Sequence, residues 1–119
     1  AWCGSAAELS RLIASIDGMP HVKDILSQKS IQFMTTEQPD HQYSIGWNYT
    51  PKSNRPWIRT GSLAGTSAIV LKYPDGQCWI LITNTSTWKG HGFSNDTMAF
   101  FEKLRKQFIA DMPKKDLFI

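Results

Sequence analysis

The sequence has no long apolar run and no long run of one charge. A membrane-spanning helix needs about 20 consecutive apolar residues, and no stretch approaches that length. The first residues also lack the basic-then-apolar order of a signal peptide, so we expect none in this chain. The 13 basic and 10 acidic residues are spread along the sequence, with no run longer than Lys114-Lys115. We therefore expect neither a transmembrane segment nor a nucleic-acid partner.

Cysteine and histidine are scarce. The two cysteines, Cys3 and Cys78, are too few to define a disulfide framework, and we expect two free thiols, although their pairing stays open. The histidines His21, His41 and His91 are scattered, with no second ligand at the spacing of a metal site. We expect no metal ion and no cofactor.

The beginning of the chain has the pattern of an amphipathic helix. Ser5 and Glu8 have the spacing of a capping box, which predicts a helix from about Ser5 to Ile16. Gly18 and Pro20 end it. Its apolar face consists of Leu9, Leu12, Ile13 and Ile16.

The middle of the chain gives weaker signals. Helical stretches are expected from about Val22 to Leu26 and around Lys29 to Met34. An aromatic strand is expected from Gln42 to Tyr49, followed by an exposed proline-containing loop. From Trp57 onward the strand pattern is clearer.

The runs Ala68 to Tyr73 and Cys78 to Asn84 predict two strands that need cover on both faces. The Asp75-Gly76 pair between them predicts a hairpin turn and therefore antiparallel pairing. A last helix is expected from near Ser94 or Asn95 to about Ile109, and its apolar face consists of Met98, Phe101, Leu104 and Phe108. The predicted fold is one α+β domain over residues 1–119, an antiparallel sheet flanked by amphipathic helices.

A basic residue, a hydroxyl and a glycine follow one another at Arg59-Thr60-Gly61. A strand with this order offers a guanidinium, a hydroxyl donor and a stretch without a side chain, along which a substrate carboxylate and a reacting carbonyl can dock. The same tripeptide also occurs where an edge strand runs into a glycine turn and the arginine is simply solvated.

The residues around this tripeptide follow a longer pattern, Tyr-x-x-Gly-Trp, then basic-Thr-Gly, then Gly-Thr-Ser and two core strands. Here these are Tyr43 to Trp47, Arg59 to Ser62, Gly65 to Ser67 and the two strands named above. The pattern resembles the C-terminal part of the serine β-lactamase and penicillin-binding-protein superfamily, in its class C-like β-lactamase and esterase branch. The resemblance covers most of the chain, and relatives of this kind act in the bacterial periplasm or cell envelope.

Two of the three catalytic elements of that superfamily are missing. The sequence contains no Tyr-x-Asn or Ser-x-Asn, and its Ser-x-x-Lys, Ser86 to Lys89, follows the basic strand and runs into Gly90-His91-Gly92. A nucleophile motif should precede that strand and open a helix. The resemblance therefore implies a C-terminal fragment of a larger hydrolase, inactive alone, whose missing N-terminal half is its partner.

The resemblance also implies roles for the basic strand. The backbone N–H of Ser62 would be a catalytic donor to the oxyanion, and Thr60 would hydrogen-bond the substrate carboxylate or the leaving group. Arg59 would add positive charge, and Gly61 would leave space where the substrate passes. Arg59 departs from the usual Lys or His, and it cannot transfer a proton as they do. The substrate stays open among β-lactams, D-Ala peptides and esters.

Two further expectations come from the residues themselves. Few helices are available to cover two apolar sheet faces, and each exposed large apolar side chain forfeits about 1.5–3 kcal/mol. We therefore expect the chain to self-associate or to dock on its missing half. An alternative function is a non-catalytic module that binds a peptide or glycan through the sheet edge or through Trp47, Tyr49 and Trp57; those aromatic residues could equally pin the strands.

Overall fold

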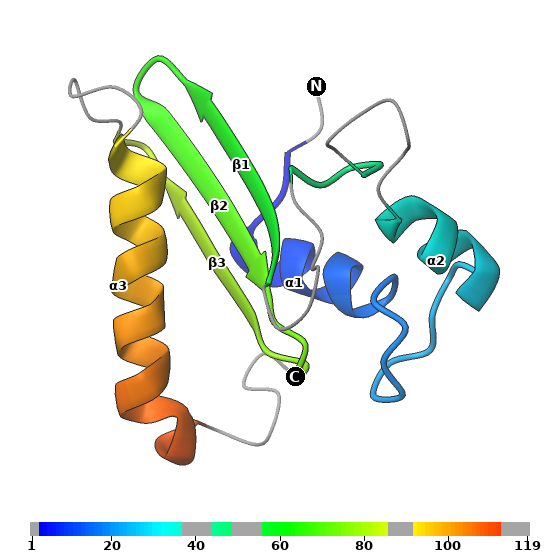
Figure 1. Ribbon diagram of the computed structural model, residues 1–119. Helices are drawn as coiled ribbons and strands as arrows, with labels where there is room; N and C mark the ends of the chain where they lie inside the picture. The colour runs from blue at the N-terminus through cyan, green and yellow to red at the C-terminus, as the bar shows by residue number, and fades with distance from the viewer. Residues whose placement is uncertain (1–2, 37–43, 49–55, 86–91, 113–119) are drawn as a thin grey trace.

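The computed structural model describes residues 3–36, 44–48, 56–85 and 92–112. Within these residues the chain forms three α-helices, three strands and a short 3-10 helix (Figure 1). In chain order they are α1 (Ala6–Ala14), α2 (Gln28–Thr35), β1 (Trp57–Leu63), β2 (Thr66–Lys72), β3 (Cys78–Thr83), α3 (Gly92–Phe108) and η1 (Ile109–Asp111). The predicted α+β class is confirmed. The described residues contain no helix long and apolar enough to cross a membrane.

The three strands form an antiparallel sheet in the order β1-β2-β3, so β2 is central and β1 lies at an edge. Leu63 pairs with Thr66 across the β1–β2 turn, where Gly65 has a φ of 77°. The predicted Asp-Gly turn joins β2 to β3, and Gly76 has a φ of 93° there. Both turns use glycine because other residues rarely adopt positive φ.

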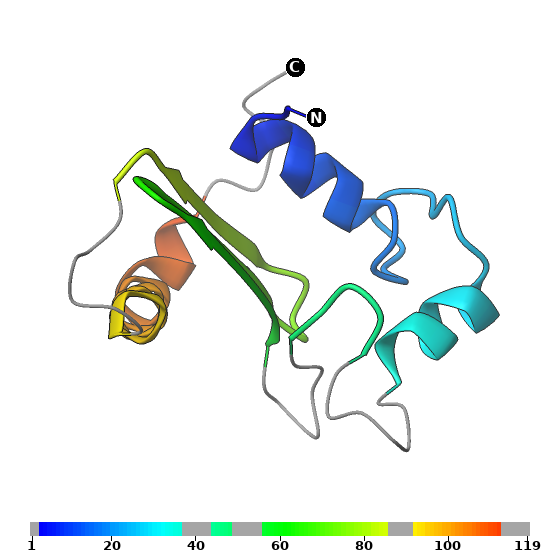
Figure 2. The same cartoon turned by 90° about the horizontal axis from the view of Figure 1, so that it is seen from above.

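The two faces of the sheet carry different helices, α1 on one side and α3 on the other (Figure 2). On the α3 face the buried cluster consists of Ile69, Leu71, Tyr73 and Phe101. On the α1 face it consists of Ile13, Trp47 and Val70. The expectation that the strands need cover on both faces is thus confirmed, and β2 supplies residues to both clusters because its side chains alternate.

The predicted helix ends are close to those observed. The capping box is present, since the Ser5 N–H donates to Glu8 Oε2 at 2.7 Å and the Glu8 N–H donates to Ser5 Oγ at 3.2 Å. Helix α1 ends at Ala14, two residues earlier than expected, and α3 begins at Gly92, before the expected start. In the predicted face of α3, Phe101 is buried, whereas Phe108 is 42% exposed and lies outside the core.

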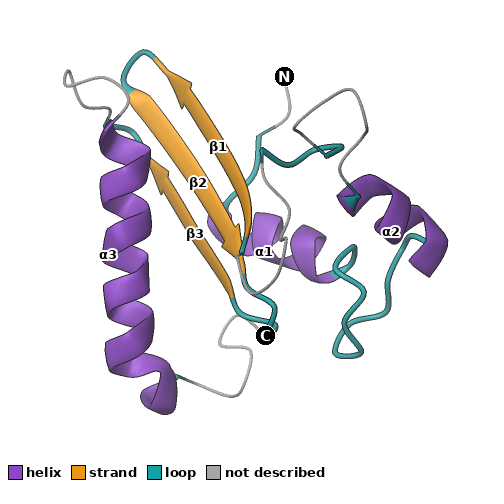
Figure 3. Cartoon of the chain, in the orientation of Figure 1, coloured by secondary structure: helices purple, strands orange, loops and turns teal. Residues whose placement is uncertain are grey.

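The helix expected from Val22 to Leu26 is wrong, because this segment forms turns and bends. Hydrogen bonds that compete with a helix explain the difference. The Asp24 carboxylate accepts from the Gly18 N–H at 3.2 Å, and the Ile25 N–H donates to the Ser15 carbonyl at 2.8 Å. The chain becomes helical only after Ser27, whose side chain caps α2, as expected around Lys29 to Met34. Helix α2 lies away from the sheet, past the C-terminal end of α1 (Figure 3).

The strand expected from Gln42 to Tyr49 is also wrong in its described part, residues 44–48. Ser44 and Trp47 form an isolated bridge around a tight turn, in which Gly46 has a φ of 83°. A left-handed glycine at this point reverses the chain, which an extended strand cannot accommodate. Residues 42, 43 and 49 lie outside the described residues.

A buried ion pair joins the loop after α1 to the end of β2. Lys72 Nζ lies 2.7 Å from Asp17 Oδ2, and the two side chains are only 4% and 5% exposed. The same ammonium donates to the Gly76 carbonyl at 2.8 Å. Lys72 thus connects the loop after α1 to the β2–β3 hairpin, a contact that no local sequence pattern predicts.

Candidate functional site

The predicted site residues Arg59, Thr60, Gly61 and Ser62 all lie in the edge strand β1. On its outer side, this strand meets Asn48. The Asn48 N–H donates to the Ile58 carbonyl at 2.8 Å, and Asn48 Oδ1 accepts from the Thr60 N–H at 2.8 Å. The backbone groups of residues 58 and 60 therefore point away from β2, toward the outer edge of the sheet.

The alternation of an antiparallel strand gives Ser62 the same orientation as residues 58 and 60. Its N–H therefore points to the outer edge as well, and the residue is exposed. No described residue accepts a hydrogen bond from this N–H. Of the backbone donors on this edge, Thr60 is occupied by Asn48, whereas Ser62 is open to a ligand.

The side chains of Arg59 and Thr60 lie on opposite faces of the sheet, because adjacent strand residues alternate. Arg59 lies two residues after Trp57 and so shares its face, the α1 face. Thr60 lies two residues after Ile58 and so shares the α3 face. Thr60 Oγ1 is 3.5 Å from Asn48 Oδ1, at the limit for a hydrogen bond. Arg59 and Thr60 thus cannot bind the same substrate group from one face of the sheet, although both lie close to its outer edge.

Gly61 is not required by the fold. Its φ is not in the left-handed region, and a Cβ built at this position meets nothing within 4 Å. Glycine inside a strand costs about 0.5–1 kcal/mol relative to alanine. Neither backbone geometry nor packing therefore requires glycine at position 61. A functional role for Gly61 would have to depend on the free space beside it.

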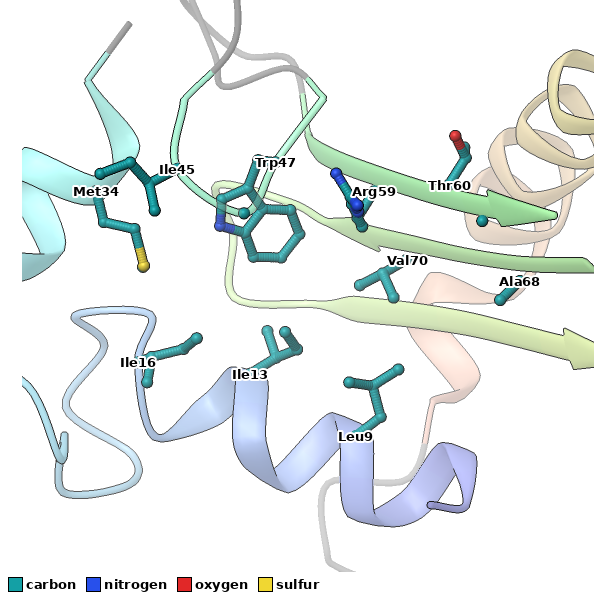
Figure 4. Close-up of a pocket in the computed structure, with 12 residues that line it drawn as sticks. Leu9, Ile13, Ile16, Met34, Ile45, Trp47, Arg59, Thr60, Ala68 and Val70 are labelled. Atoms are coloured by element: carbon teal, nitrogen blue, oxygen red, sulfur yellow. The ribbon is translucent and has the colours of Figure 1, made fainter. Parts of the chain in front are cut away.

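An apolar pocket with a volume of about 340 Å³ lies beside this strand on the α1 face. It is lined by Leu9, Ile13 and Ile16 of α1, by Met34, Ile45, Gly46 and Trp47, and by Arg59, Thr60, Gly61, Ala68 and Val70 of the sheet. The α1 side chains point toward Val70 and Ala68, and Arg59 lies on the side of β1 (Figure 4). Arg59 is the single charged residue among these described lining residues.

Two of the three aromatic residues proposed to stack on a ligand, Trp47 and Trp57, pack against each other. Trp47 is only 4% exposed, and its ring meets that of Trp57 edge-on, with centroids 5.3 Å apart and an angle of 63° between the planes. The pair holds the turn of residues 44–47 against the start of β1. Tyr49, the third aromatic residue, lies outside the described residues.

The remaining candidates lie away from this strand. Cys3 and Cys78 are free thiols, and burial raises the pKa of Cys78 to about 11. His21 is exposed in the loop after α1, and within the described part of the chain no three side chains of the metal-ligating kinds come together. The Ser86 to Lys89 motif, like His41 and His91, lies outside the described residues.

Sequence reasoning found the strand but missed the residues that shape its surroundings. Asn48 directly follows the Gly-Trp pair, yet nothing in the sequence indicates that its backbone and side chain occupy the edge of β1. The sequence predicts Leu9 and Ile13 on the apolar face of the first helix, and in the structure both also line the pocket. Comparison with family models, with curated proteins and with solved structures finds no match for this chain.

Proposed function

We propose that this chain is the C-terminal, oxyanion-stabilising part of a serine hydrolase that resembles β-lactamases and penicillin-binding proteins. The nucleophile is supplied by a segment outside these 119 residues. The observation that carries the proposal is the open edge of β1, with the Ser62 N–H directed outward beside an apolar pocket. By the same resemblance, the enzyme acts in the bacterial periplasm or cell envelope.

In this proposal the reaction is acyl transfer through a covalent intermediate. A serine oxygen attacks the carbonyl carbon of an ester, peptide or β-lactam, the carbonyl oxygen gains negative charge, and the leaving group departs with a proton. Water then releases the acyl group. The Ser62 N–H hydrogen-bonds the oxyanion, whose charge develops only as the bond forms, so it stabilises the transition state more than the substrate.

Arg59 has the electrostatic role. Its guanidinium is exposed and forms no ion pair with any described acidic side chain, so it is available to a substrate carboxylate. A planar guanidinium accepts a carboxylate through two parallel hydrogen bonds. The free space over Gly61 lets the substrate backbone approach between Arg59 and Ser62, and this gives the unexplained glycine a function.

A pair of substitutions at Ser62 tests the oxyanion role in the protein that joins this chain to its nucleophile. Ser62→Pro removes the outward N–H, which pairs with no neighbouring strand, and Ser62→Ala keeps it. We expect Ser62→Pro to lower kcat by about 10²–10³-fold and Ser62→Ala to change it little. Equal rates for both variants, each with wild-type thermal stability, would remove Ser62 from the mechanism.

The chain by itself is expected to give no turnover. A chromogenic β-lactam or ester should be hydrolysed no faster with the 119-residue chain than without it. A rate that Ser86→Ala abolishes would instead assign the nucleophile to Ser86.

A second candidate function is non-catalytic binding of an extended peptide along β1. The outward backbone groups of Ser62 favour it, since a peptide lying along the edge satisfies such groups. Stacking on a glycan through Trp47 is not favoured, because that ring is buried. Peptide binding without hydrolysis by the protein that carries the upstream segment would favour this second candidate.

A further inference from the structure

The pocket is the part of the α1 face that α1 itself leaves open. Helix α1 packs on β3, where Ile80 contributes to the same cluster as Ile13. The region in front of β1 and β2 is covered at one end by Trp47 and is otherwise hollow. Its volume of about 340 Å³ lies within the usual range of small-molecule sites, about 300–1,000 Å³.

The pocket lining is apolar except near Arg59 and Thr60. Aliphatic and aromatic side chains form the interior, and the Arg59 guanidinium is the charged group at the β1 side. An apolar body gains by leaving water in such a pocket, while an anionic group gains by meeting Arg59 where solvent still reaches it. A ligand with an apolar body and an anionic group contacts both the apolar lining and Arg59. A purely apolar or purely ionic ligand contacts only one of them.

We propose that this pocket binds an amphipathic carboxylate, with its alkyl or aromatic body against the apolar lining that includes Leu9 and Ala68 and its carboxylate on Arg59. This inference rests on the proposed function. If the chain is part of a hydrolase, the pocket narrows the substrate to an ester or amide with a hydrophobic, anionic portion. The binding itself needs no nucleophile, so the 119-residue chain suffices to measure it.

The experiment compares octanoate with 1-octanol, which has the same alkyl chain and no charge. Each is titrated into the chain below its aggregation limit, and backbone amide NMR shifts report the affinity and the location. We expect shifts at Leu9, Ile13 and Trp47, and about fivefold tighter binding of octanoate, since a partly exposed ion pair contributes up to about 1 kcal/mol.

Three variants make the test specific. Arg59→Gln should abolish the preference for octanoate, and Lys103→Gln, which removes an equal charge from the exposed side of α3, should preserve it. Ala68→Val adds methyl groups to the lining, in a residue type that strands favour, and should weaken both ligands. Arg59 and Lys103 are exposed, so their substitution leaves the core intact.

Several outcomes would overturn the inference: equal affinity for the two ligands, the same loss from Lys103→Gln as from Arg59→Gln, or shifts confined to other surfaces such as the outer side of α3. A pocket filled by a second copy of the chain, seen as ligand binding that weakens with protein concentration, would overturn it too. None of these results bears on Ser62. A failed titration beside a positive Ser62→Pro result removes the substrate class and leaves the hydrolase.

Discussion

The two faces of the sheet differ in how completely they are closed. On the α3 face, the Tyr73 hydroxyl donates to Glu102 at 2.7 Å, and the Arg105 guanidinium lies 4.3 Å from the centre of the Tyr73 ring while it pairs with Asp75. On the α1 face, α1 covers β3, whereas the pocket lies over β1. Helix α3 covers the α3 face of the sheet, whereas the α1 face keeps accessible apolar surface in the pocket.

The largest effect should come from truncating each core. Phe101→Ala removes a buried ring from the closed face and should lower the free energy of unfolding by about 3–5 kcal/mol. Ile13→Ala should cost less, about 2–3 kcal/mol, because it removes fewer buried atoms and the pocket already leaves one side of Ile13 without packing contacts. Urea denaturation followed by tryptophan fluorescence measures both. Equal losses would mean that the two faces are equally closed.

The thiols test how dry the α1 face is over β3. Burial raises the pKa of Cys78 from 9.0 to about 11, so its thiolate fraction at pH 8 falls by roughly a hundredfold. Iodoacetamide should therefore alkylate the exposed Cys3 first, as mass spectrometry of timed samples would reveal. Comparable rates for the two thiols would place water at the base of the α1 face.

The same pKa shift has a consequence for stability. A thiol that stays protonated in the folded state and ionises in the unfolded state favours unfolding as pH rises from about 9 to 11. The stabilisation is complete below pH 9 and declines through that window. Cys78→Ala should flatten the fall between these pH values, while Cys3→Ala should not.

Self-association should follow the open face. Leu63 is 79% exposed at the end of β1, and strand alternation sets it on the α1 face, whereas Phe100 is 55% exposed on α3. Light scattering at several concentrations should detect association that Leu63→Ser reduces more than Phe100→Ser. A chain that stays monomeric at every concentration and binds no apolar dye would contradict the expectation.

The smallest effect concerns Gly61. Gly61→Ala should stabilise the isolated chain by about 0.5–1 kcal/mol, because the position needs no glycine. In the proposed hydrolase the same change should lower kcat/KM, since the methyl group would occupy the proposed path of the substrate. Higher stability with unchanged kcat/KM would make the glycine incidental.

Local signals in the sequence predicted much of the fold. The capping box at Ser5 and Glu8 and the Asp-Gly turn before Gln77 each depend on a few neighbouring residues, and both appear as expected. The helix expected from Val22 to Leu26 is absent because the Ile25 N–H donates to the Ser15 carbonyl and the Asp24 carboxylate accepts from the Gly18 N–H. Such competition depends on tertiary contacts that periodicity does not report.

The candidate site was predicted only in part for the same reason. The order Arg59-Thr60-Gly61 is visible in the sequence, but its position on an outer strand and the occupation of Thr60 by Asn48 are not. The pocket needs α1, the turn of residues 44–47 and the sheet to meet, and the 44–47 turn was expected to be extended. Long-range assembly, rather than residue type, creates these features.

The bridge that Asn48 makes to β1 also limits sheet growth at the β1 edge. An unpaired strand is a template for neighbouring copies and for fibril formation. By occupying Ile58 and Thr60, one asparagine leaves only the last residues of the strand available, too few to seed a continuous ladder. At this edge the protein can thus expose a short stretch of backbone without exposing the whole of β1 to polymerisation.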